Sequence, residues 1–171
     1  MTISPVHHVS LTVSDLDRSI RWYCDVLGLR KAMESKISGH ESEAYLHLPP
    51  GTTGRMAMLQ AGRHIAGTVE LTSFDPPPRA ATPPKRPGDP GAWMVAFEVV
   101  GETLEQAAAR LRERGGQFWS EPTDVEVEGY PTFRAALLLD PDGILIELLQ
   151  LPAPDEIRSA RDAERSRDAG S

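Results

Sequence analysis

Three side chains with acid–base chemistry lie in mostly apolar, strand-like segments: His8, Glu70 and Glu147. Glu70 stands in VELT and Glu147 in IELL, where a carboxylate is costly unless it is paired, bound to a metal ion or open to water. Two carboxylates that share a site repel each other, so one keeps its proton near neutral pH and acts as an acid while the other acts as a base. This pair suits the movement of a proton between carbons next to a carbonyl, and a bound metal ion would instead polarise that carbonyl.

The alternation of residue types predicts that these side chains share one face of a sheet. In each segment apolar residues alternate with the set that contains His8, Glu70 or Glu147, and helices on one face of the sheet would bury the apolar set. The other set, which includes Ser10 and Thr72, then faces a concave side. His7 has the opposite parity, and we expect it to be structural.

The segments that carry these residues occur in the same order twice. Residues 4–74 and 92–151 each have the pattern of a strand, a helix and three or more strands, which predicts an internal duplication of a βαβββ unit. The expected helices cover 14–29 and 103–116, and a DPDG turn joins the last two strands. The expected strands are 6–13, 29–37, 42–48, 55–60 and 67–74 in the first half, and 93–100, 117–122, 132–140 and 144–150 in the second.

The duplication predicts which positions meet. Alignment of 8–13 with 94–99 places Met94 opposite His8, and alignment of 69–74 with 146–151 places Glu147 opposite Glu70. If the halves are related by a pseudo-twofold axis, these four positions converge. Between the halves, residues 75–91 are rich in proline and indicate a linker or surface loop. Residues 152–171 form a polar tail, either a frayed helix or a disordered segment.

The composition excludes several classes of protein. The chain has 171 residues, with 18 Lys and Arg against 25 Asp and Glu, which gives a net charge of −7. Such a chain is poorly suited to bind nucleic acid or an anionic membrane through a broad basic surface. The single cysteine, Cys24, excludes an internal disulfide. The first residues lack a secretory signal pattern and no apolar run is long enough for a membrane span, so we expect a cytoplasmic protein.

The chain resembles the vicinal oxygen chelate superfamily, which includes glyoxalase I, methylmalonyl-CoA epimerase, extradiol dioxygenases and bleomycin resistance proteins. The resemblance implies an α+β fold of two βαβββ units that form an open, curved mixed sheet with a concave cavity. It is closest in motif to glyoxalase I and methylmalonyl-CoA epimerase. The segments that carry it are HVSLTVSDLDRSIRWYCDVLGL (8–29), VELTSF (69–74), GAWMVAFEV (91–99) and DPDGILIELLQ (140–150).

The resemblance implies metal ligands at His8, Glu70 and Glu147, with Met94 at the fourth family position. Family members have a histidine there, and the soft thioether of Met94 matches poorly a hard, carboxylate-rich site for Ni, Zn, Mg, Mn or Fe. The implied site therefore holds an atypical metal or none. The residues expected to line a substrate cavity are Ser10, Tyr45, His47, Thr72, Trp93 and Met94, with Tyr45 and His47 sharing parity on the expected strand 42–48.

The function expected from these residues is a glyoxalase-like enzyme that transfers a proton without redox change, as an isomerase, epimerase or lyase. Glu70 and Glu147 would be the catalytic groups, and a small molecule the substrate. An alternative is a metal-free protein that binds or sequesters a small molecule, as bleomycin resistance proteins do. An extradiol-type dioxygenase is disfavoured because position 94 does not supply a second histidine. The resemblance also implies a homodimer.

Overall fold

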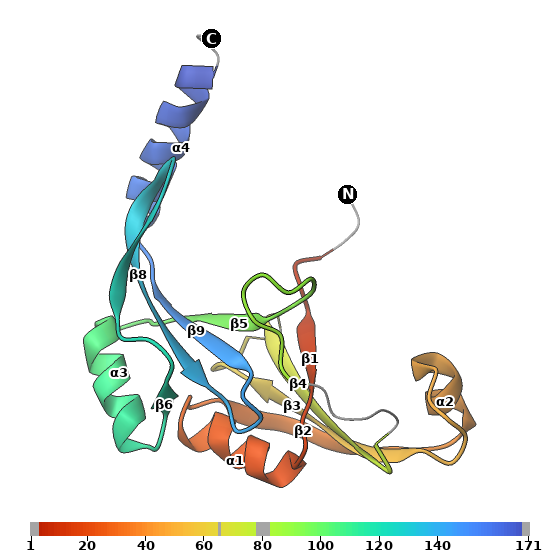
Figure 1. Cartoon of the computed structure of the whole chain (residues 1–171). Helices are drawn as coiled ribbons and strands as arrows, with labels where there is room; N and C mark the ends of the chain where they lie inside the picture. The colour runs from red at the N-terminus through yellow and green to blue at the C-terminus, as the bar shows by residue number, and fades with distance from the viewer. Residues whose placement is uncertain (1–3, 65, 78–82, 169–171) are drawn as a thin grey trace. The chain divides into compact units, whose positions relative to one another are not determined.

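The computed structural model describes residues 4–64, 66–77 and 83–168, and it confirms the expected α+β fold (Figure 1). The chain divides into two compact units, each built around its own sheet. Unit 1 comprises Met1–Pro84 with Asp140–Gly143, and unit 2 comprises Lys85–Leu139 with Ile144–Ser171. Within the described ranges, none of the helices combines the length and the apolar character needed to cross a membrane.

Unit 1 contains a mixed four-stranded sheet in the order β1-β4-β3-β2. β1 runs parallel to β4, and the pairs β4–β3 and β3–β2 are antiparallel. The elements are β1 (His8–Thr12), α1 (Leu16–Asp25), β2 (Arg30–Ile37), α2 (His40–Leu46), β3 (Thr53–Gln60) and β4 (Thr68–Asp75).

Helix α1 covers one face of this sheet. Its first turn is capped by Asp15, whose carboxylate accepts a hydrogen bond from the Arg18 backbone N–H at 2.9 Å. Gly28 follows the helix with a φ of 81°, a left-handed conformation that glycine adopts without steric cost. The residues that α1 helps to bury are apolar side chains of β3 and β4, namely Ala57, Leu59, Val69 and Leu71, each 0–1% exposed.

The turn between β8 and β9 belongs to unit 1 and bonds to α1. The carboxylate of Asp142 accepts hydrogen bonds from the Ser14 backbone N–H at 3.2 Å and from the Arg18 guanidinium at 2.8 Å. The Tyr23 hydroxyl donates to Asp140 at 3.1 Å, and both side chains are buried. The expected DPDG turn is therefore present, and its two aspartates also anchor it to a helix far away in the sequence.

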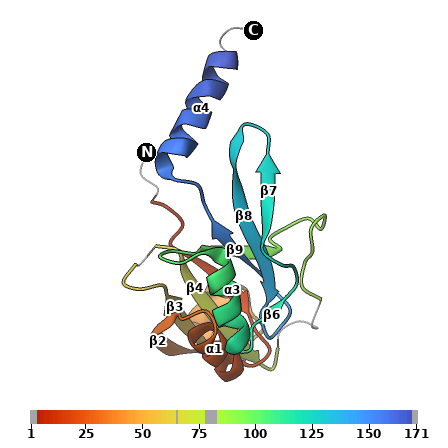
Figure 2. The same ribbon diagram turned by 90° about the vertical axis from the view of Figure 1, so that its left-hand side faces the viewer.

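Unit 2 contains a sheet in the order β5-β9-β8-β6, with β7 paired to β8. Figure 2 shows β7 and β8 side by side as a hairpin, with α4 at the end of the chain. The first helix of this unit buries one apolar face, made of Leu104, Ala107, Ala108 and Leu111. The elements are β5 (Met94–Glu98), α3 (Leu104–Glu113), β6 (Gln117–Phe118), β7 (Thr123–Val127), β8 (Tyr130–Leu139), β9 (Leu145–Gln150) and α4 (Pro154–Asp168).

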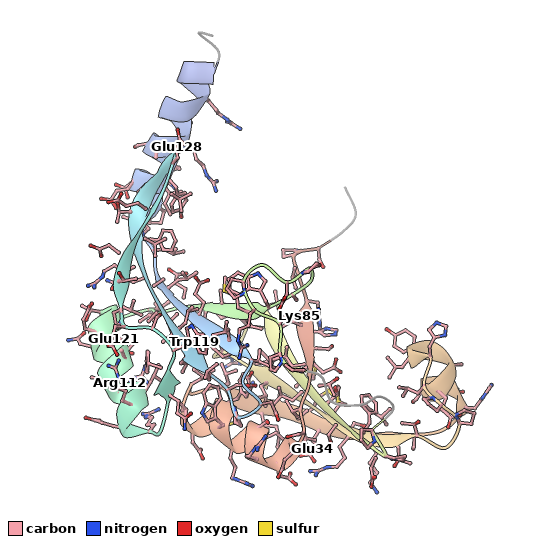
Figure 3. All side chains as sticks on the ribbon, in the orientation of Figure 1. Glu34, Lys85, Arg112, Trp119, Glu121 and Glu128 are labelled. Atoms are coloured by element: carbon pink, nitrogen blue, oxygen red, sulfur yellow. The ribbon has the colours of Figure 1, made fainter. Side chains whose placement is uncertain are left out.

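Helix α3 is held by local polar contacts at both of its ends. Thr103 and Gln106 form a capping box, in which each side chain bonds to the backbone N–H of the other. Near the other end, the Arg112 guanidinium lies over the Phe118 ring at 4.3 Å and pairs with Glu121 at 2.6 Å. Arg112 and Glu121 lie next to each other in Figure 3.

The first and last strands of each unit pair in the same register. In both units these two strands are parallel, and the glutamate of the last strand faces the third residue of the first strand. The matching pairs are His8 with Thr68 and Ser10 with Glu70 in unit 1, and Met94 with Leu145 and Ala96 with Glu147 in unit 2.

The prediction of a strand over 42–48 is wrong, because helix α2 occupies most of this segment. Gly39, with a φ of 88°, ends the preceding strand region, and Glu41 and Glu43 lie in the first turn, where acidic residues favour a helix. Strand β7 was not expected. Of the proline-rich segment, residues 78–82 lie outside the described part of the chain, as do residues 169–171 of the tail.

Candidate functional site

A row of polar side chains lies on the sheet face of unit 1 that α1 does not cover. Residues opposite each other in paired strands point to the same face, and the register therefore puts Ser10 beside Glu70 and Thr12 beside Thr72. The hydroxyls of Thr12 and Thr72 are 3.3 Å apart. The apolar residues between these positions face α1, so the polar row forms the opposite surface of the sheet.

His8, Ser10 and Glu70 form a cluster within this row. The Ser10 hydroxyl donates a short hydrogen bond to Glu70 Oε2. The Nε2 atom of His8 lies 3.6 Å from the same oxygen, and its side chain is 40% exposed against 18% for Glu70. Both of these contacts, made by residues that the structure describes, end on Oε2 of Glu70.

Methionines of β2 and β3 border this cluster on the same face. Met58 pairs with Glu70 in the register of β3 and β4, and Met56 pairs with Thr72. Met33 of β2 pairs with Met58 and is 51% exposed. These flexible thioether side chains offer an adaptable apolar surface next to the polar row.

Glu147 is the acidic residue of the matching position in unit 2. It lies on β9, between Ala96 of β5 and Leu137 of β8, so its neighbours across the sheet are apolar. Burial raises the pKa of the Glu147 carboxyl, because an apolar setting disfavours the charged form. No charged group in the described parts of the chain counteracts this rise in pKa.

Met94 is the first residue of β5 in unit 2 and Trp93 precedes the strand, and both side chains are half-buried. Met94 takes the position of His8 in the register, since it stands two residues before the partner of Glu147. A weak, soft donor therefore stands where unit 1 has an imidazole.

The structure does not place Tyr45 and His47 on a strand. Tyr45 lies on α2 and is 83% exposed, and His47 ends that helix in a left-handed conformation with a φ of 52°. The shared strand parity that suggested a cavity position for both residues therefore does not exist. Their part in substrate binding stays a prediction without that support.

The donor set within each unit falls short of an ordinary metal centre. Protein metal sites use three or four protein ligands, whereas unit 1 offers the pair His8 and Glu70, and unit 2 offers Glu147 with the thioether of Met94. Across residues 4–64, 66–77 and 83–168, no three His, Cys, Asp or Glu side chains lie close enough together to hold a metal ion. The residues described do not by themselves fit the metal that the resemblance implies.

Strand alternation did not indicate the contact that His7 makes with His8. Strand β1 begins at His8, so His7 precedes the strand and alternation does not govern its direction. Its Nδ1 atom lies 2.9 Å from Nδ1 of His8, and the two rings meet edge to face. Two adjacent histidines at the start of a strand are the one signal in the sequence that could have indicated this contact.

The chain is similar to known proteins over most of its length. A sequence model of the Glyoxalase/Bleomycin resistance protein/Dioxygenase superfamily matches residues 6–148. The 2-epi-5-epi-valiolone epimerase of an Actinomyces species is 28% identical over 151 residues, which cover 86% of this chain and 80% of the relative. Lactoylglutathione lyase GLX1 of Arabidopsis thaliana is 27% identical over 150 residues, 86% of this chain but 45% of that protein.

A solved structure has the same fold. The crystal structure of a glyoxalase family protein from Bacillus cereus superimposes with a TM-score of 0.72 and 23% sequence identity. The match covers 89% of this chain and 97% of that one.

Proposed function

The chain belongs to the Glyoxalase/Bleomycin resistance protein/Dioxygenase superfamily, and on this premise we propose that it is an enzyme that moves a proton next to a carbonyl group of a small molecule. A lyase and an epimerase are among its relatives. The reaction involves no redox change, and its class is isomerase, epimerase or lyase. Glu70 and Glu147 are the groups that carry the proton.

The observation that supports this proposal most is the environment of Glu147. Its carboxyl lies among apolar residues of β5 and β8, and burial raises its pKa. A carboxyl that keeps its proton closer to neutral pH is suited to act as a general acid. We assign this role to Glu147.

Glu70 is suited to the complementary role of general base. Ser10 and His8 both approach Glu70 Oε2, so the carboxylate has a defined orientation. Its Oε1 atom takes the proton from the carbon next to the carbonyl, and the electron pair of the broken C–H bond shifts toward the carbonyl oxygen. Glu147 then gives its proton to the substrate carbon. Delivery to the opposite face of the same carbon inverts the stereocentre and re-forms the original carbonyl. In a 2-hydroxy carbonyl compound, delivery to the former carbonyl carbon isomerises the molecule: the hydroxyl proton moves to the other oxygen and the new carbonyl forms at the first carbon.

The resemblance to this superfamily implies a divalent metal ion. The positions that correspond to its ligands in this chain are His8, Glu70, Glu147 and Met94. Because Met94 is a poor ligand for a hard cation, we expect proton transfer to persist after chelation.

A second candidate is a metal-free binding protein without turnover. The observation that favours it is again Met94, because a protein that only binds its ligand does not need a complete set of metal donors. In this case Glu147 would be a half-buried residue that lines the ligand-binding cavity. Its substitution by glutamine would leave the affinity for an uncharged ligand nearly unchanged.

We also propose that the protein acts as a homodimer, since members of the superfamily often do. Light scattering coupled to size-exclusion chromatography measures the mass directly. A mass of one chain, 18.7 kDa, at all concentrations would contradict this part of the proposal.

The proposed function is tested by exchange of carbon-bound hydrogen with solvent. The full chain is incubated in D₂O with hydroxyacetone or 2-epi-5-epi-valiolone, after dialysis against EDTA and again with Mg²⁺, Mn²⁺, Ni²⁺ or Zn²⁺ added. Proton NMR follows loss of the signal next to the carbonyl, and calorimetry measures binding. We expect exchange at least about 100-fold above the protein-free rate, the contribution typical of a positioned acid or base. Binding without exchange in every arm would establish the second candidate instead.

A further inference from the structure

We propose that the substrate of the proton transfer carries a carboxylate, and that Arg86 binds this carboxylate beside the indole ring of Trp119. The inference rests on the proposed function and names its substrate class, a small ketone whose apolar chain ends in a carboxylate. All of the residues that support it belong to unit 2. Arg86 lies in the proline-rich segment between the two halves of the sequence.

Trp119 lies on the same face of the unit 2 sheet as Glu147. Phe118 faces α3, because the guanidinium of Arg112 on that helix lies over its ring. The next residue, Trp119, therefore points to the opposite face. Its backbone N–H donates to the Leu137 carbonyl at 2.7 Å, and Leu137 pairs with Glu147 in the register of β8 and β9. Trp119, Leu137 and Glu147 thus form a row across the sheet, on the face opposite α3.

The row has an apolar middle between its two ends. Neighbouring strands lie about 4.8 Å apart, so the backbones of Trp119 and Glu147, on either side of β8, are separated by about 10 Å. The half-buried Leu137 lies between them. Phe133 and Ala135 share its face of β8, because residues two apart in a strand point the same way. A molecule that reaches from Glu147 to Trp119 therefore crosses an apolar surface.

Arg86 is held over the far end of this row. Its guanidinium carbon lies 5.2 Å from the centroid of the Trp119 ring, the distance of a cation–π contact. Trp119 is still 56% exposed, so this contact leaves much of the ring open to a ligand. A turn fixes the backbone: the Arg86 N–H donates to the Asp89 carboxylate at 2.8 Å, and the Asp89 N–H donates to the Arg86 carbonyl at 2.9 Å.

A carboxylate is the group that matches this end of the row. The guanidinium has five N–H donors in a planar fork, and a carboxylate accepts two of them side by side. The attraction to the Trp119 ring acts on the charge of Arg86 and uses none of these donors in a hydrogen bond. Lys85, which is exposed and labelled in Figure 3, is the next residue in the chain. The two cations outnumber the carboxylate of Asp89, and they attract an anion to this place in a chain with a net charge of −7.

The first test compares two ligands that differ in charge alone. Calorimetry at pH 7 and low salt measures the binding of 7-oxooctanoate and of 7-oxooctanamide to the full chain, after dialysis against EDTA. Both ligands have a ketone at one end of an apolar chain, and only the first has a carboxylate at the other. We expect the acid to bind about tenfold more tightly, the order given by hydrogen bonds to a charged group. Equal affinities, or no binding of the acid, would show the inference to be wrong.

Variants then assign the preference to the arginine. Arg86→Gln should weaken binding of the acid about tenfold and leave binding of the amide unchanged, so that the two affinities become equal. Arg86→Lys keeps the charge without the planar fork, and it should retain part of the preference. The matched control is Arg158→Gln, which makes the same change of charge at an exposed position of α4 and should keep the full preference.

Thermal unfolding distinguishes a binding role from a purely structural one. A contact that only fastens the segment around Arg86 to Trp119 would make Arg86→Gln less stable without any change in the ratio of the two affinities. A lower Tm together with an unchanged preference for the acid would therefore overturn the inference.

Hydrogen exchange in D₂O separates this inference from the function on which it rests. We expect the hydrogens next to the ketone of 7-oxooctanoate to exchange with a kcat/KM about tenfold above that of the amide, and Arg86→Gln to remove this difference. If the acid is preferred through Arg86 but no carbonyl compound exchanges its hydrogen, the proposed function fails while Arg86 still binds a carboxylate. If hydroxyacetone or 2-epi-5-epi-valiolone exchanges but the acid has no advantage over the amide, the proposed function stands and the inference about Arg86 is overturned.

Discussion

The hydrogen bond from Tyr23 to Asp140 gives a sharp test of how the β8–β9 turn is anchored. Both side chains are buried, at 0% and 4% exposure, and the hydroxyl donates to the carboxylate at 3.1 Å. Burial beside this carboxylate raises the pKa of Tyr23, so the phenol stays a donor throughout the accessible pH range. Tyr23→Phe removes the donor and leaves the ring in place. Hydrogen bonds to charged groups contribute about 1.5–3 kcal/mol to stability, so we expect Tyr23→Phe to lower the free energy of unfolding by about 2 kcal/mol.

The assay is thermal unfolding followed by circular dichroism at pH 7. For a chain of this size 1 kcal/mol shifts the midpoint by about 2–4 °C, so Tyr23→Phe should lower Tm by about 6 °C. Tyr45→Phe is the matched control, because Tyr45 is 83% exposed on α2. The Tm of this variant should lie within about 1 °C of that of the wild type. If the two variants melt together, the buried hydrogen bond does not anchor the turn and the reasoning fails.

Three further predictions concern other parts of the chain. Ile146→Ala removes most of a fully buried side chain of β9 and should lower the free energy of unfolding, measured with denaturant, by about 2–5 kcal/mol. An equal loss of stability for Val100→Ala, at a position that is 80% exposed, would contradict the assigned core. Because the pKa of Glu147 is raised in the folded protein, its charge opposes folding as pH rises above the ordinary carboxyl range. The Tm of Glu147→Gln should therefore exceed that of the wild type at pH 7, and the two values should converge at about pH 4. A difference in Tm that stays constant across this range would show that the charge of Glu147 is not its cause. Arg55→Met removes the ion pairs of Arg55 with Asp17 and with Glu34, which is labelled in Figure 3. The Tm of this variant should lie slightly below that of the wild type at low salt, and the difference should vanish in about 1 M NaCl, where the screening length is about 3 Å. A difference in Tm that does not depend on salt would indicate lost packing instead.

Local patterns were sufficient to predict the long helices and most strands. The buried positions of α3 follow from its apolar spacing, and its end follows from the glycine after the helix. Helix α2 was missed because residues 42–48, which it overlaps, have the alternation of a strand in their second half, while a left-handed glycine and an acidic first turn favour the helix. Strand β7 was missed because it forms by pairing with β8, a contact that a short polar segment does not reveal.

The candidate site was predictable where side-chain direction follows from strand alternation. His8, Ser10 and Glu70 are brought together because β1 and β4 pair in parallel and residues two apart share a face. Contacts outside the strands were not predictable in this way. His7 meets His8 through the geometry of the chain before β1, and Asp140 meets Tyr23 across 117 positions of sequence.

The most direct test of the central claim is the exchange rate of the two carboxylate variants under saturating substrate. Glu70→Gln and Glu147→Gln are compared with the wild type in D₂O by proton NMR, with calorimetry to show that each still binds, and Glu126→Gln on the exposed β7 strand is the control. We predict that each site variant loses about 100-fold or more of the exchange rate while the control keeps it. Exchange at the wild-type rate in both site variants, with binding intact, would contradict the assignment of the proton transfer to Glu70 and Glu147.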